Sequence, residues 1–72
     1  MPASASQLDY VRRLASRIGR AAALRVEALA KRRFGKPLAE LSRNEATHLI
    51  LTLRAVKAGE LDWETVLEES AG

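Results

Sequence analysis

Arginine and lysine are the side chains in this sequence best suited to bind a ligand. Residues 10–36 hold nine of them against a single acid, Glu27, a local balance of +8. Seven of the nine are arginine, whose planar guanidinium donates paired hydrogen bonds to a phosphate group. Arg13, Arg17 and Arg20 recur at the spacing of one helix face. The nine predicted phosphate-binding residues are Arg12, Arg13, Arg17, Arg20, Arg25, Lys31, Arg32, Arg33 and Lys36.

Base recognition has less support than phosphate contact. Tyr10 is the only aromatic side chain near the stripe of Arg13, Arg17 and Arg20, and proteins that stack on single-stranded bases use several rings. The sequence also gives little support to a helix–turn–helix motif, because its turn, residues 35–41, would be too long. That segment has seven residues, where the motif normally has three or four. DNA, RNA and an acidic protein all remain open as the partner of the basic half.

Catalytic chemistry has few candidates. His48 is the single histidine, and its position on the outer face of a helix favours a solvated residue. Glu64, Glu68 and Glu69 are close enough in sequence to share a metal ion, but a solvated helix face is the simpler interpretation. The chain has no cysteine and no glycine-rich loop. We therefore expect no enzyme activity, no metal site and no cofactor.

Apolar residues outside the expected core give a second functional hypothesis. Leu51 lies opposite the buried stripe of its helix, beside Ala55, while Trp63, Val66 and Leu67 share a face of a short C-terminal helix. The simplest closure folds that helix back over the Leu51 strip. The alternative joins one strip to a symmetry mate in a dimer. A protein–protein interaction module or small homo-oligomer using these five residues is thus the alternative function, and the chain is a monomer or a homodimer.

Charge is unevenly divided along the chain. Residues 60–72 carry five acids and no base, in contrast to the basic segment 10–36. A polarity of this kind is typical of chains that associate with charged partners. It also allows residues 60–69 to approach the basic half of the same chain or of another, where they would compete with phosphate for the arginines.

Capping signals predict the helix that carries the first arginines. Ser4 or Ser6 would accept a hydrogen bond at its start, with Gln7 or Asp9 three residues later completing a capping box. Gly19 would end the helix in the left-handed conformation.

The remaining helices follow from similar signals. A second helix is predicted over residues 21–34 and ends at Gly35. Ser42 and Glu45 form a full capping box for the third helix, and Asp62 caps a short fourth.

Composition agrees with an all-α protein: a bundle-like domain of three helices with a short fourth C-terminal helix. Alanine (13) and leucine (11) make up a third of the chain, against nine β-branched residues. We expect one domain over residues 1–72, frayed at 1–5 and 71–72. No apolar run is long enough for a signal peptide or a membrane span, so we expect a cytoplasmic protein without a membrane partner. The predicted core is Leu14, Ile18, Leu29, Phe34, Leu41, Leu49, Ile50 and Leu53.

A longer pattern carries a resemblance to a known kind of module. Residues 29–53 contain a Phe-Gly pair at 34–35, followed by Leu-Ser at 41–42, Ala-Thr at 46–47 and Ile50. With the preceding helix, about residues 6–57, this resembles the small helical C-terminal module of phage-type single-strand annealing recombination proteins and, more loosely, GemA-like phage regulators. The resemblance implies a non-catalytic accessory role in DNA recombination or repair.

Overall fold

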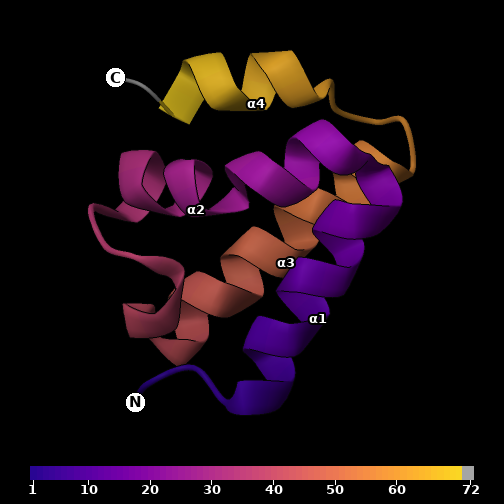
Figure 1. Ribbon diagram of the computed structural model, residues 1–72. Helices are drawn as coiled ribbons and strands as arrows, with labels where there is room; N and C mark the ends of the chain where they lie inside the picture. Colours follow the sequence, from indigo (N-terminus) through magenta and orange to yellow (C-terminus); the bar gives the residue numbers. More distant parts are fainter. Residues whose placement is uncertain (71–72) are drawn as a thin grey trace.

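The chain folds into three main helices and a short C-terminal helix, as the sequence predicts (Figure 1). The computed structural model describes residues 1–70, except for the side chains of residues 69 and 70, so the fraying expected at 71–72 lies outside the described residues. The elements are α1 (Ala5–Ile18), α2 (Arg20–Phe34), the 3-10 helix η1 (Leu38–Glu40), α3 (Arg43–Lys57) and α4 (Trp63–Ser70).

Both predicted capping boxes form. Ser4 accepts a hydrogen bond from the backbone N–H of Gln7 at 3.1 Å, and the Gln7 side chain accepts one from the Ser4 N–H at 3.1 Å. Ser42 and Glu45 make the same reciprocal pair at the start of α3. These boxes satisfy N–H groups that have no partner inside the helix, and thereby fix where α1 and α3 begin.

The prediction for Gly19 is wrong in its conformation. Gly19 does end α1, but its backbone is extended (φ 159°, ψ 169°) rather than left-handed helical. The reason is that α2 begins at the next residue, Arg20, so a single extended residue turns the chain between two helices. Gly35 behaves as predicted and ends α2 in the left-handed conformation (φ 71°, ψ 17°).

The core lies where α1 packs against α2 and α3. Five of the eight predicted core residues are buried: Leu14, Leu29, Leu41, Leu49 and Leu53. The other three, Ile18, Phe34 and Ile50, are only partly buried and pack against the edge of the core. The predicted core does not include Val11 or Leu38, which are both fully buried, although Val11 lies on the apolar stripe of the first helix.

Helix α4 packs against α2, where Figure 1 shows it lying alongside, and not over the Leu51 strip of α3. Val66 and Leu67 are buried in the core, 2% and 6% exposed, whereas Leu51 is 56% exposed. The expectation that α4 folds back over Leu51 is therefore wrong. The acidic segment instead approaches the basic half of its own chain, and apolar side chains make that contact.

The first residues of the chain are hydrogen-bonded to the segment that leads into α3. The N–H of Ala3 donates to the carbonyl of Leu41 at 2.9 Å, and the N–H of Arg43 donates to the carbonyl of Met1 at 2.8 Å. Gln7 adds a side-chain hydrogen bond to Thr47 at 3.1 Å. These contacts hold the start of the chain beside the start of α3, so that the first turns of α1 and α3 lie next to each other.

Candidate functional site

The nine predicted phosphate-binding residues are spread over two helices and one loop. Arg12, Arg13 and Arg17 lie on α1, Lys36 follows α2, and the other five lie on α2. All are exposed except Lys36, which is half-buried. The predicted single stripe of Arg13, Arg17 and Arg20 does not form, because the helix breaks at Gly19 and Arg20 belongs to α2.

Three of the nine cations already bind groups within the chain. Arg13 forms an exposed ion pair with Asp9 at 2.9 Å, and Arg33 is hydrogen-bonded to Nε2 of His48 at 3.0 Å. Lys36 pairs with Oε1 of Glu45 at 2.9 Å. His48 also makes an edge-to-face ring contact with Phe34, so it lies on the surface as predicted, but with definite neighbours.

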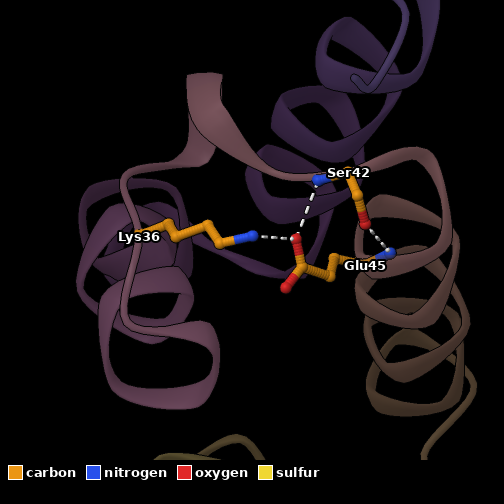
Figure 2. A network of polar contacts seen from close by, with 3 residues as sticks. All are labelled: Lys36, Ser42 and Glu45. Carbon is orange, nitrogen blue, oxygen red and sulfur yellow. Dashed lines mark hydrogen bonds and ion pairs between the residues drawn. The ribbon is translucent and has the colours of Figure 1, made fainter. Parts of the chain in front are cut away.

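The pair formed by Lys36 belongs to the framework of the fold. Figure 2 shows one carboxylate oxygen of Glu45 accepting from both the Lys36 ammonium and the Ser42 backbone N–H, the latter at 2.8 Å. These hydrogen bonds, first that of the Ser42 N–H and then that of Lys36, hold the pKa of Glu45 below its ordinary value. Lys36 thereby ties the loop after α2 to the start of α3, and its ammonium is already paired with a carboxylate.

Four cations without a carboxylate partner among the described residues gather on the outer face of α2. Ala21, Arg25, Ala28 and Arg32 follow one another at helical spacing and are all exposed. Arg20, Leu24 and Lys31 lie beside them and are also exposed, Leu24 by 77%. Among the described residues, none of Arg20, Arg25, Lys31 and Arg32 forms an ion pair or side-chain hydrogen bond. Alanine between the cations leaves room for a backbone to approach.

The only carboxylate of α2 forms no ion pair with these cations. Oε2 of Glu27 accepts a hydrogen bond from the backbone N–H of Leu38 at 3.0 Å, at the start of η1. Helix α2 has five cations and one acid, so it keeps an excess of four positive charges. A part of this charge stabilises the helix itself, because Lys31, Arg32 and Arg33 lie at its negative C-terminal end.

A second surface feature is a groove between α1 and α3, with a volume of about 510 Å³. Its walls are two stripes at helical spacing. One is Tyr10, Leu14 and Arg17 on α1, and the other is Leu51 and Ala55 on α3 with Ala58 at the C-cap of that helix. Arg54, Lys57 and Glu60 complete the lining. We call this feature the α1–α3 groove.

The predicted partner-binding residues fall into two groups. Leu51 and Ala55 line the α1–α3 groove. Val66 and Leu67 are buried in the chain's own core, and Trp63 packs against it, so these three do not extend the exposed strip. Their helical spacing correctly indicated an apolar face, but the neighbour that covers it is α2 rather than another molecule.

Sequence reasoning missed the cations that α3 contributes. Arg54 and Lys57 lie outside the basic segment 10–36, yet the fold brings them beside Arg17. The available signal was local for Arg54, which follows Leu51 by three residues and therefore borders the same strip of α3.

No family matches this sequence, and neither the curated proteins nor the solved structures contain a match. The resemblance to annealing modules therefore remains a prediction. Within residues 1–70, no helix has the length and apolarity to cross a membrane. Among the described side chains, which do not include that of residue 69, no three potential ligands gather in a way that could hold a metal ion.

Proposed function

We propose that this chain is a non-catalytic nucleic-acid-binding accessory protein whose outer α2 face contacts phosphates. The observation that carries the proposal is the set of four exposed cations on that face, Arg20, Arg25, Lys31 and Arg32, none with a carboxylate partner among the described residues. Exposed cations without partners break no ion pair when they bind a phosphate, and their binding releases the counterions condensed on the polymer.

The arrangement favours contact with the backbone over recognition of bases. No aromatic side chain lies on the outer face of α2, so stacking adds nothing there. Phosphate contacts position a protein but carry no sequence information. The proposed binding is therefore salt-dependent and largely indifferent to sequence. The resemblance to annealing modules supports DNA as the polymer and recombination or repair as the setting.

A charge-reversal pair tests the proposal. Fluorescence anisotropy of a labelled DNA duplex, its single strand and an RNA of the same sequence would be measured at about 50 mM salt. In the double variant Arg25→Glu/Arg32→Glu we expect at least a tenfold loss of affinity for whichever polymer binds the wild type.

The matched control reverses two cations elsewhere. Arg54→Glu/Lys57→Glu changes the net charge by the same amount in the α1–α3 groove and should reduce affinity by less than threefold. Equal losses in both doubles would show a non-specific effect of net charge. Absence of binding by the wild type to all three polymers would refute the proposal.

A further inference from the structure

We propose that the α1–α3 groove is a docking site for an acidic amphipathic helix of another protein. This surface is separate from the outer face of α2, and the inference is independent of nucleic-acid binding. It follows from the shape of the groove, the apolar side chains exposed in it and the charges at its rim.

The walls of the groove fit a helix. Both stripes that line it follow the spacing i, i+4, i+7: Tyr10, Leu14 and Arg17 along α1, and Leu51, Ala55 and the C-cap residue Ala58 along α3. Side chains of a packing helix enter grooves between such rows. Alanine at two of the three positions of the second stripe allows a close approach of the incoming helix. A helix laid between α1 and α3 is thus the occupant whose side-chain rows match the two walls.

Apolar surface in the groove has no cover within the described chain. Leu51 is 56% exposed and Tyr10 is 41% exposed. Helix α4, the nearest candidate in sequence, packs against α2 instead, and its Val66 and Leu67 are buried there. Binding of apolar side chains over Leu51 and Tyr10 would remove this surface from water.

Charge selects the occupant. Arg17, Arg54 and Lys57 contribute three positive charges to the lining, against the single carboxylate of Glu60. Among the described residues none of the three cations forms an ion pair. A helix with leucine-type residues along one stripe and aspartate or glutamate on either side matches this lining. Its leucines would contact the apolar side chains of the groove, and its carboxylates would pair with the three cations.

The same charges argue against two other occupants. A second copy joined through this groove by two-fold symmetry would place Arg17, Arg54 and Lys57 opposite the same three cations. A nucleic acid would find phosphate partners at the rim, but phosphate contacts would leave the exposed apolar surface of Leu51 and Tyr10 uncovered.

A titration with a synthetic peptide tests the inference. The peptide is a helix of about four turns, with leucines at the i, i+4, i+7 and i+11 positions and glutamates flanking them. It is added to the ¹⁵N-labelled full chain, and amide shifts are followed by NMR. A second peptide replaces every glutamate with lysine, and a third has the acidic sequence scrambled.

We expect the acidic peptide to shift the amides around Tyr10, Leu51 and Ala55, with saturation at micromolar concentrations. The lysine and scrambled peptides should bind at least tenfold more weakly. Leu51→Glu and Arg54→Glu/Lys57→Glu should each weaken the acidic peptide at least tenfold, whereas Arg25→Glu/Arg32→Glu should leave its affinity within threefold. Leu51 is exposed, so its substitution should not unfold the chain, and a circular dichroism melt checks this.

Four results would overturn the inference. These are a failure of the acidic peptide to shift groove amides, equal binding of the three peptides, shifts of the same amides by a DNA or RNA oligonucleotide alone, and a concentration-dependent dimer that Leu51→Glu dissociates. None of the peptide outcomes depends on whether the outer face of α2 binds nucleic acid.

Discussion

Two leucines on α3 can test whether α4 packs on α2, as observed, or whether α4 or a second copy covers the Leu51 strip. Leu49 is fully buried in the core and Leu51, two residues later in the same helix, is 56% exposed. Truncating either one to alanine removes the same atoms from the same element. Alanine is at least as good a helix former as leucine, so helix propensity adds no penalty to either variant.

The expected costs differ several-fold. Removing a buried leucine side chain costs about 2–5 kcal/mol, because transfer free energy is lost and a cavity remains. Substitutions on the surface usually fall within about 0.5 kcal/mol of neutral. A chain of 72 residues has a total stability of roughly 4–11 kcal/mol at typical values per residue. Leu49→Ala should therefore remove a large part of the stability, and a cost of about 3 kcal/mol lowers Tm by roughly 12–24 °C.

Urea unfolding followed by far-ultraviolet circular dichroism measures both costs at two protein concentrations. We expect Leu49→Ala to be strongly destabilised and Leu51→Ala to unfold close to the wild type. If Leu51→Ala costs as much as Leu49→Ala at both concentrations, α4 or another segment covers Leu51 and the described packing is wrong. A cost for Leu51→Ala that grows with protein concentration would instead reveal a dimer through that strip.

Three further changes test the framework and the charge distribution. Because the pKa of Glu45 is lowered in the folded chain, its contribution is present above the ordinary glutamate pKa of about 4.3 and is lost as the pH falls through the lower folded value. Urea midpoints between pH 5 and 3 should thus fall more steeply for the wild type than for Glu45→Gln, and parallel curves would contradict this. Gly35→Ala forces alanine into a left-handed conformation (φ 71°) and should lower the free energy of unfolding by about 1–2 kcal/mol in the same urea assay. An unchanged free energy of unfolding would contradict the left-handed conformation of Gly35. Glu64→Gln/Glu68→Gln should raise nucleic-acid affinity about two- to fivefold at low salt, with no gain at high salt, and unchanged affinity in an anisotropy titration would show that α4 does not compete.

The elements of the fold were predictable because their signals are local. The capping boxes of Ser4 and Ser42 act within one helical turn, so spacing alone indicates them. The break at Gly19 was also visible, although its extended conformation depends on how closely the next helix follows.

The docking of α4 was not predictable from these patterns. Both α2 and α3 offered apolar surface to Val66 and Leu67, and helical periodicity does not say which neighbour covers a stripe. The contact between α4 and α2 joins segments far apart in the sequence, so local patterns do not encode it.

The candidate site was predictable in its chemistry but not in its arrangement. The arginine-rich first half of the chain predicted a site for phosphate groups. In the structure, however, Lys36 pairs with Glu45, and Arg17 lines the α1–α3 groove together with Arg54 and Lys57. Their juxtaposition depends on the long-range pairing of α1 with α3.

The salt dependence of nucleic-acid affinity tests most directly whether the outer face of α2 binds phosphates. If Arg20, Arg25, Lys31 and Arg32 each neutralise one phosphate, a plot of log K against log salt has a slope of about −3.6 for duplex DNA and about −2.8 for a single strand. Replacing Arg25 and Arg32 together by glutamine should reduce the magnitude of that slope by about 1.4–1.8, whereas Arg54→Gln/Lys57→Gln should leave it nearly unchanged. A slope that does not respond to the α2 pair, or that falls equally with the groove pair, would contradict the proposed interface.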